Sequence, residues 1–357
     1  MSRFFSDKYT TLAAYVPGEQ PKDQQYIKLN TNENAFPPHP AVCAAAEKAA
    51  EQLHLYPDPE CRELRERLAK RLDVSPDELL MTNGSDEILN FAFMAFCDKH
   101  IPAVFPDITY GFYPVFAQID QVPYREIPLT DDLRIRPRDY FQTAGTIFIA
   151  NPNAPTGIAL RRAEIEEILQ QNPYNVVVVD EAYVDFGAES CVPLIREYDN
   201  LLVTQTFSKS RSLAGGRLGF GAACPEIIAD LKTVQYSTNP YNIDRMTMAA
   251  GIACLENDEY NMNNCRIISE TREWTRGELE KLGFETTDSR TNFLFAKHPE
   301  IAGEELYRKL KQRGILIRHF PKERIGDYNR ITVGTREQMK RLIREISRIL
   351  SRKEPEA

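Results

Sequence analysis

Three short apolar runs in the middle of the chain constrain its fold most. They span residues 146–150, 176–179 and 201–206, and they are rich in β-branched residues. None of them alternates apolar with polar residues, and stretches of helical periodicity such as 161–171 lie between them. Apolar strands joined by helices are typical of a parallel sheet that is covered on both faces. The pattern therefore predicts an α/β fold with a mostly parallel central sheet.

The chain also divides into a larger and a smaller part. Its 357 residues suggest about two domains, since a typical domain has ~150 residues. The clearest helical pattern, at 60–72, precedes the predicted sheet, whereas the last third begins with a long helical pattern at about 258–282 and then mixes strands with helices. We predict a large α/β domain over residues 31–255. A smaller α+β domain is expected from residues 256–357 together with an N-terminal arm, residues 1–30.

Charge and composition exclude several classes of protein. The net charge is −8, which argues against a general nucleic-acid binder. No apolar run approaches the ~20 residues that cross a bilayer, and residues 6–8 (Ser-Asp-Lys) stand where a signal peptide needs its apolar stretch. The seven cysteines never form a CxxC pair, which favours reduced thiols, and the histidines form no short metal-binding pair. We expect a cytoplasmic protein with no metal and no nucleic-acid or membrane partner.

Polar residues follow each of the three predicted strands. In open parallel α/β sheets, ligands bind outside the carboxyl ends of the strands. Asp180, Lys209 and Arg217 are therefore expected to converge at one edge of the sheet. They lie in the segments that follow the strands, together with a polar loop: 151–157 (NPNAPTG), 180–183 (DEAY), 206–210 (TFSKS) and 215–221 (GGRLGFG).

The residue types at this edge suggest one kind of ligand. Asp180 follows four valines and is poorly hydrated, so it needs a cationic partner. Lys209 lies between small hydroxyl residues, where an amine with a lowered pKa can form an imine. Arg217 offers a planar fork for phosphate, and Ser85 opens a predicted helix whose first N–H groups also suit phosphate. A carbonyl, a phosphate and a ring nitrogen that gains from a carboxylate are all present in pyridoxal phosphate.

This hypothesis gives each residue a role. Lys209 holds the aldehyde as an imine, Asp180 keeps the pyridine nitrogen protonated, and Tyr110 stacks on the ring. The residues expected around the phosphate are Ser85, Asp86, Thr206, Ser208 and Arg217.

Each of these features is weak evidence alone. A single lysine is usually a solvated charge, an aspartate after a strand is more often a helix cap or turn residue, and Gly84–Asp86 is most simply a helix start. The glycine-rich segment 215–221 has neither the GxGxxG nor the GxxxxGK spacing of a nucleotide-binding loop. It is the order of all these features at strand ends that favours the cofactor site.

Longer motifs recur along nearly the whole chain: KLNTNENAFPP (28–38), YPDPECRELRERLA (56–69), NGSDEIL (83–89), NPNAPTG (151–157), VVVVDEAYVDF (176–186), TFSKS (206–210), AGGRLGF (214–220), NPYNID (239–244), TNFLF (291–295) and NRITVGT (329–335). Through them the sequence resembles the fold-type I pyridoxal-phosphate-dependent aminotransferases, and among these the histidinol-phosphate aminotransferases. The resemblance implies pyridoxal 5′-phosphate as cofactor. It also implies amino-group transfer between L-histidinol phosphate and 2-oxoglutarate, in histidine biosynthesis.

The resemblance implies further residue roles. Tyr183 would hydrogen-bond the phenolic oxygen of the cofactor. Arg330, helped by Arg318, would bind the α-carboxylate of glutamate or 2-oxoglutarate, or the phosphate of the other substrate. Tyr56 would reach the cofactor phosphate of a neighbouring subunit, which implies a homodimer with shared active sites. The substrate pocket would also be lined by Asn32, Tyr15 and Tyr241.

One position departs from the family pattern. The family usually has Asn immediately before Pro-Thr-Gly, donating to the phenolic oxygen, whereas this chain has Ala154. Either Asn153 takes over this role or Tyr183 acts alone; the difference is about one hydrogen bond, ~1 kcal/mol.

Three other functions are compatible with the same cofactor motifs. An aromatic amino-acid aminotransferase would differ only in its substrate pocket. A pyridoxal-phosphate-dependent lyase, such as a threonine-phosphate decarboxylase, would release carbon dioxide and need no oxo acid. A regulator that senses the cofactor usually carries a DNA-binding module, and here the motifs begin by residue 28.

Overall fold

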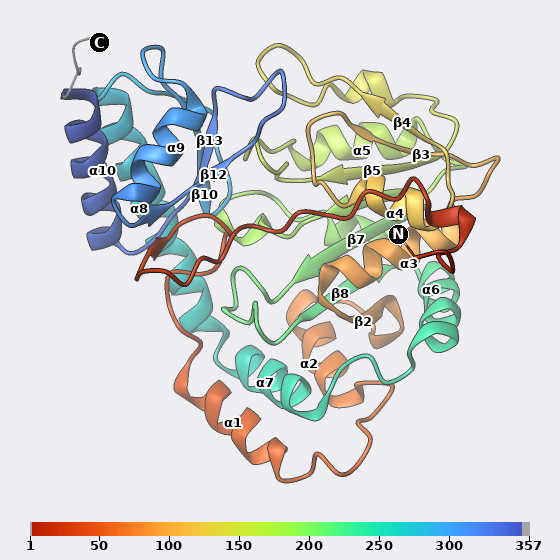
Figure 1. Ribbon diagram of the computed structural model, residues 1–357. Helices are drawn as coiled ribbons and strands as arrows, with labels where there is room; N and C mark the ends of the chain where they lie inside the picture. Colours follow the sequence, from red (N-terminus) through yellow and green to blue (C-terminus); the bar gives the residue numbers. More distant parts are fainter. Residues whose placement is uncertain (1, 352–357) are drawn as a thin grey trace.

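A twisted seven-stranded sheet is the centre of the larger part in the computed structural model, which describes residues 2–351 (Figure 1). The strand order is β2-β8-β7-β6-β5-β3-β4. Strands β7, β6, β5, β3 and β4 are parallel to one another, and β8 is antiparallel to both β7 and β2. The expected α/β class is therefore confirmed. The strands are β2 (Leu79–Asn83), β3 (Ala103–Pro106), β4 (Tyr124–Ile127), β5 (Thr146–Ala150), β6 (Val177–Asp180), β7 (Leu201–Thr206) and β8 (Leu218–Ala223).

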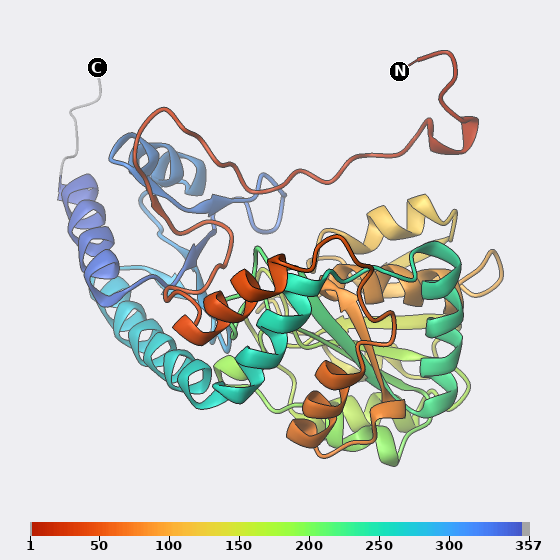
Figure 2. The same ribbon diagram turned by 90° about the horizontal axis from the view of Figure 1, so that it is seen from below.

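Burial on both faces explains why the central strands are continuously apolar. In β6, Val177 and Val179 belong to one apolar cluster and Val178 to another, on the opposite face. Helices cover both faces of the sheet (Figure 2). One cluster takes side chains from α3 (Gly84–Phe96), α4 (Tyr113–Ile119) and α6 (Pro225–Thr238). The other takes them from α1 (Pro40–Ala50), α2 (Arg62–Leu72), α5 (Arg162–Gln170) and α7 (Arg245–Glu256).

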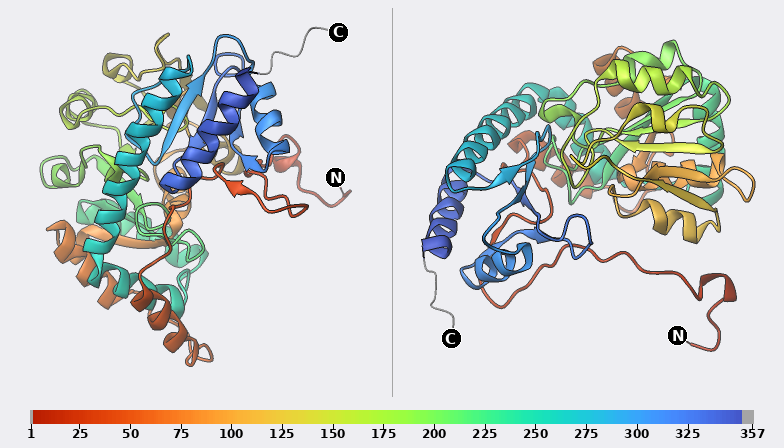
Figure 3. Two further views of the ribbon diagram at one scale, coloured as in Figure 1. Left: turned by 90° about the vertical axis from the view of Figure 1, so that its left-hand side faces the viewer. Right: turned by 90° about the horizontal axis from the view of Figure 1, so that it is seen from above.

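A smaller part lies beside the large one (Figure 3). It holds an antiparallel sheet in the order β12-β13-β10-β9, and the short strand β1 from the N-terminal segment pairs in parallel with β11. The domain limits predicted from the sequence stay a prediction. The strands of the smaller part are β1 (Ile27–Lys28), β9 (Glu285–Thr286), β10 (Phe293–Lys297), β11 (Ile315–Leu316), β12 (Arg318–His319) and β13 (Asn329–Thr332). Its helices are α8 (Asp258–Lys281), α9 (Gly303–Gln312) and α10 (Arg336–Ser351). The 3₁₀ helices of the chain are η1 (Asp7–Tyr9), η2 (Pro76–Glu78), η3 (Pro137–Tyr140), η4 (Val184–Phe186) and η5 (Val192–Arg196).

The residues before β1 form an arm that crosses from the small part to the large one (Figure 2). On the small part, the carboxylate of Glu19 accepts hydrogen bonds from two side chains of α9, Tyr307 and Lys311. On the large part, the ring of Tyr15 stacks on Phe112, with the ring centroids 4.2 Å apart. The arm thus contacts both parts of the molecule.

Two further findings concern residues 2–351 as a whole. None of their helices has both the length and the apolar character needed to cross a membrane. All seven cysteines lie in this range with free thiols, and Cys43 is the exposed one among them.

Candidate active site

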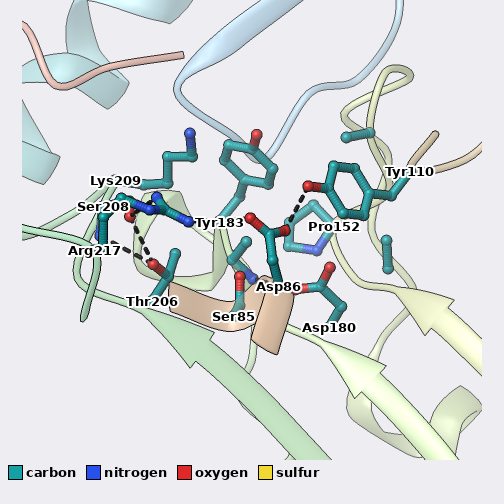
Figure 4. A pocket seen from close by; sticks show the side chains of 13 residues that line it. Ser85, Asp86, Tyr110, Pro152, Asp180, Tyr183, Thr206, Ser208, Lys209 and Arg217 are labelled. Atoms are coloured by element: carbon teal, nitrogen blue, oxygen red, sulfur yellow. Dashed lines mark hydrogen bonds and ion pairs between the residues drawn. The ribbon is translucent and has the colours of Figure 1, made fainter. Parts of the chain in front are cut away.

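A cavity at the carboxyl ends of β5, β6 and β7 brings most of the predicted cofactor residues together (Figure 4). They come from four places: the start of α3, the turn after β3, the end of β6 and the loop between β7 and β8. The predicted residues that line it are Ser85, Asp86, Tyr110, Asp180, Tyr183, Thr206, Ser208, Lys209 and Arg217.

Asp180 ends β6 and is buried, with 6% of its surface exposed. Its carboxylate accepts hydrogen bonds from the backbone N–H of Ala182 at 3.2 Å and from the hydroxyl of Tyr113 at 3.4 Å. No described side chain forms an ion pair with it. Burial raises the pKa of Asp180 to about 7. A buried carboxylate without a cationic partner fits a protonated ring nitrogen.

The opposite end of the cavity is a cradle for an anion. Gly84 begins α3 with φ +73°, and a Cβ at this position would lie 2.5 Å from Nη2 of Arg217. The first N–H groups of α3 have no partner inside the helix, as at every helix start. Arg217 lies 3.1 Å from the carboxylate of Asp86 and 3.4 Å from Oγ of Ser208. This donor set suits a phosphate group.

Lys209 lies in the loop after β7, between the anion cradle and Tyr183 (Figure 4). Its Nζ is 5.8 Å from the centroid of the Tyr183 ring, and among residues 2–351 it forms no ion pair. The backbone carbonyl of Lys209 accepts a hydrogen bond from Asn34 at 2.8 Å. The loop is held in place, and the amine is left available.

A second cavity adjoins the first and shares Tyr110, Ala154, Tyr183 and Lys209 with it. Among the residues that line this second cavity are four of the predicted substrate residues: Tyr15, Asn32, Arg318 and Arg330.

Arg330, on β13, gives this second cavity its positive charge. Its guanidinium donates to the backbone carbonyl of Asn30 at 3.1 Å and lies 5.4 Å and 5.5 Å from the ring centroids of Phe293 and Phe320. Its Nε is buried without a hydrogen-bond partner, and no described carboxylate pairs with the side chain. Burial lowers the pKa of Arg330, but a guanidinium stays charged in proteins. An anionic substrate group would supply the missing partner.

Arg318 connects this cavity with the arm. Its guanidinium donates to the backbone carbonyls of Val16 and Pro17, at 3.2 Å and 3.3 Å. The arm, including Tyr15, therefore forms one wall of the substrate cavity.

Asn153 lies outside the cofactor cavity, contrary to the expectation that it binds the cofactor. Its Oδ1 accepts from the hydroxyl of Thr109 at 2.7 Å, and its Nδ2 donates to the carbonyl of Ile108 and to Thr156 at 2.9 Å and 3.1 Å. The amide is fully engaged inside the protein, and it is Ala154 that lines the cavity. This position therefore offers no side-chain donor.

Tyr56 and Tyr241 also lie outside both cavities. Their rings stack with centroids 4.7 Å apart, and 77% and 44% of their surfaces are exposed. The prediction that Tyr241 lines the substrate pocket is not met within this chain. Tyr56 was expected to act on a neighbouring subunit, and its exposure is compatible with that.

Several site residues were missed in the sequence. Tyr113 starts α4 and contacts Asp180, but nothing in its sequence neighbourhood indicates that contact. Ala182 and Asn34 lie within motifs that the sequence does mark, DEAY and NENAF, so those motifs were the available signal.

Known proteins share both the sequence and the fold. A family model described as aminotransferase class I and II matches residues 24–346. A protein of Bradyrhizobium diazoefficiens named histidinol-phosphate aminotransferase 1 is 48% identical over 98% of this chain and its own full length. One of Acinetobacter baylyi, named histidinol-phosphate aminotransferase, is 49% identical over 96% of both chains.

Solved structures agree in fold. A putative histidinol-phosphate aminotransferase from Erwinia carotovora atroseptica has a TM-score of 0.85 at 25% identity, covering 91% of this chain and 96% of that one. The Sinorhizobium meliloti histidinol-phosphate aminotransferase in complex with pyridoxal-5′-phosphate also has a TM-score of 0.85, at 23% identity over 92% of both chains. The resemblance seen in the motifs is confirmed: the chain belongs to the class I and II aminotransferase family.

Proposed function

We propose that this chain is a pyridoxal-phosphate-dependent aminotransferase that transfers an amino group between L-histidinol phosphate and 2-oxoglutarate, in histidine biosynthesis. Pyridoxal phosphate is the cofactor of the family. One observation carries the proposal: Asp180, Lys209 and the anion cradle share one cavity, which adjoins a second cavity holding an unpaired Arg330. The names of relatives about 48% identical support the choice of substrate.

The residues present fit the cofactor. The carboxylate of Asp180, which has no cationic partner in the described range, would hold a proton on the ring nitrogen, and the start of α3 with Arg217 would bind the phosphate. Lys209 would attach the cofactor through its amine. When bound, pyridoxal phosphate supplies an electron sink that stabilises negative charge on the substrate carbon.

Lys209 then has a second task as a general base. With the cofactor bound, Nζ of Lys209 would remove the proton from the substrate carbon that carries the amino group. Its amine is not engaged in an ion pair with any residue in the described range, so it can accept that proton. The carboxylate of Asp180, shielded from water, would keep the ring nitrogen of the bound cofactor protonated.

Arg330 and Arg318 would bind the anionic end of either substrate. Glutamate and 2-oxoglutarate present a carboxylate, and histidinol phosphate presents a phosphate. A guanidinium can form two parallel hydrogen bonds with either group. One cationic site would thus serve both half-reactions.

We also propose that the protein is a cytoplasmic homodimer with shared active sites. Each subunit would consist of a large domain, residues 31–255, and a small domain, residues 1–30 together with 256–357. Leu53, Leu55 and Tyr56 lie next to one another in the chain and are 55%, 51% and 77% exposed. Exposed apolar residues that cluster in this way are typical of an interface. Tyr56 would extend from this surface to the cofactor phosphate of the partner subunit.

A donor screen tests the proposed substrate. With 2-oxoglutarate as acceptor, L-histidinol phosphate is expected to react faster than phenylalanine, with glutamate as the product. Faster turnover of phenylalanine would instead identify an aromatic aminotransferase. Release of carbon dioxide from threonine phosphate without an oxo acid would identify a lyase.

A further inference from the structure

Asn32 connects the small sheet with the cofactor cavity. It is buried, with 1% of its surface exposed, and has φ 58°, a left-handed conformation that Asn tolerates better than most residues. Its backbone N–H donates to Oγ1 of Thr332, on β13, at 3.0 Å. The same Oγ1 donates to Oδ1 of Asn32, also at 3.0 Å. In this arrangement Oδ1 of Asn32 faces Thr332 and Nδ2 points away from it.

The other end of the amide is therefore a donor. Nδ2 of Asn32 donates to the hydroxyl oxygen of Tyr183 at 2.8 Å. Since that oxygen accepts from Asn32, the proton of the Tyr183 hydroxyl remains available, and no residue in the described range accepts it. The ring of Tyr183 packs edge-on against Phe293, with centroids 5.2 Å apart and the planes at 87°. Both the position of the hydroxyl and its role as donor are thus set by neighbours.

The substitution at position 154 makes this donor important. Ala154 lines both cavities and has no hydrogen-bonding side chain. The adjacent Asn153 has its amide fully engaged elsewhere. The family usually has an Asn donor at position 154 in addition to the tyrosine. In this chain the Asn donor is missing, and the hydroxyl of Tyr183 is the donor that remains.

We propose that Asn32 is a positioning residue that holds the Tyr183 hydroxyl as a donor to the phenolic oxygen of the cofactor, and that this chain depends on it because position 154 is Ala. The inference rests on the proposed function. Asn32 lines the second cavity, as expected of a substrate residue, and we assign it this further role because both ends of its amide have partners inside the protein.

The hydrogen bond between Asn32 and Tyr183 has a measurable consequence in the enzyme with bound pyridoxal phosphate. A donor to the phenolic oxygen draws electron density away from the neighbouring Lys209 nitrogen, so it lowers the pKa of that nitrogen. Loss of the donor should raise the pKa. The pKa is read from the absorbance of the bound cofactor as a function of pH, without any substrate.

Asn32→Gly is the sharpest variant, because glycine accepts φ 58° and adds no charge. We expect Asn32→Gly and Tyr183→Phe each to raise this pKa by about 0.5–1 unit, the effect of one hydrogen bond. In the double variant the pKa should rise no further than in the single variants, since both changes remove the same donor. Adding Ala154→Asn to Asn32→Gly should reverse at least half of the rise, because it restores a donor from the loop.

An unchanged pKa in Asn32→Gly, or shifts that add fully in the double variant, would overturn the inference. If Asn32→Gly does not fold, Asn32→Asp replaces it. That residue keeps the size and tolerates the backbone angle, but would accept the Tyr183 proton, so the pKa should again rise and Ala154→Asn should again reverse part of it. A rise that Ala154→Asn leaves untouched would count against the inference in either background. If the unaltered protein binds no cofactor, the proposed function fails as well; a normal cofactor band that ignores Asn32→Gly overturns only the role of Asn32.

Discussion

The guanidinium of Arg217 lies 3.1 Å from the carboxylate of Asp86, so a cation and an anion share the phosphate end of the cavity (Figure 4). Both side chains are more than a third exposed, which makes the pair a weak contribution to stability. Asp86 also accepts the hydroxyl proton of Tyr110 at 2.6 Å. One carboxylate thus orients both the cation for the phosphate and the aromatic ring expected to face the cofactor.

Gly84→Ala should weaken cofactor binding. The added Cβ would lie 2.5 Å from Nη2 of Arg217, and φ +73° is unfavourable for alanine by about 1–2 kcal/mol. We expect the Kd for pyridoxal phosphate, measured by fluorescence titration, to rise about tenfold or more. The matched control is Gly215→Ala, where nothing lies within 4 Å of the new Cβ. Equal affinities for the two variants would contradict the cradle.

Lys209→Ala should abolish both attachment of the cofactor and catalysis. The variant is expected to lose the absorbance of the covalently held cofactor and to lose transamination by a factor on the order of 10³ or more, because the general base is gone. Absorbance spectra and a glutamate-release assay measure the two effects. Retained turnover would rule out the proposed mechanism.

The stability of the cofactor-free protein should fall as pH rises from about 4 to about 7. Burial raises the pKa values of Asp180 and Glu181 to about 7 in the folded protein, from ordinary values of 3.8 and 4.5. Between these values the folded state binds more protons than the unfolded state, so this part of the stability is present at low pH and is lost as pH rises through about 7.

Asp180→Asn isolates the contribution of one group. The neutral amide removes the titration of Asp180, which accounts for a change on the order of 2–4 kcal/mol in the free energy of unfolding. Thermal melting at several pH values should therefore show a shallower decline for the variant. Parallel declines would indicate that Asp180 is not the group responsible.

Arg330→Ala should raise KM for both anionic substrates by about 10- to 100-fold, the effect of losing charge-assisted hydrogen bonds. The absorbance of the bound cofactor should not change, because Arg330 lines the second cavity only. Arg330→Lys keeps the charge without the planar fork and should fall between the two. A changed cofactor spectrum with an unchanged KM would contradict the assignment.

Mixed dimers test whether active sites are shared. Lys209→Ala and Tyr56→Phe disable opposite sides of a shared site, so a hybrid dimer contains one site with both changes and one site with neither. Random mixing after dissociation should restore about a quarter of the unaltered activity. If each site is built from one subunit, Tyr56→Phe alone will keep its activity, because Tyr56 lies outside both cavities of its own chain, and mixing will restore nothing further.

The central strands were predictable because they are buried on both faces. The expected runs 146–150 and 201–206 coincide with β5 and β7, and 176–179 differs from β6 by one residue at each end. The helical pattern at 60–72 likewise corresponds to α2, whose leucines pack into the core. In these segments the positions of the apolar residues in the sequence follow directly from burial, as continuous runs in the strands and at helical spacing in α2.

Strand β8, which lies between β2 and β7, was harder to predict. Strand β8 is fully buried but carries Gly219 and Gly221, which resemble loop residues in a sequence. A Cβ at Gly219 would lie 2.4 Å from the backbone of Gly84, and one at Gly221 would lie 2.7 Å from Ile88. The glycines are there because α3 packs directly on the strand, which is a tertiary requirement with no local pattern.

The same limit applies to the site. Asp180 ends β6, and Lys209 and Arg217 lie in the connection after β7, so their convergence could be predicted from the topology. The orientation of Asn153 depends on partners about 44 residues away in the chain, such as Thr109. Neither that orientation nor the stacking of Tyr241 on Tyr56 can be inferred from local sequence.

Because β8 runs antiparallel to β7, the connection over residues 207–217 leaves and re-enters the sheet at one edge. Lys209 and Arg217 therefore sit near the two feet of a single short loop, both anchored to neighbouring strands. The span between these two groups is therefore set within the large part. The distance between Lys209 and Arg217 thus matches one fixed distance in the ligand, the one between its reactive carbon and its anionic group.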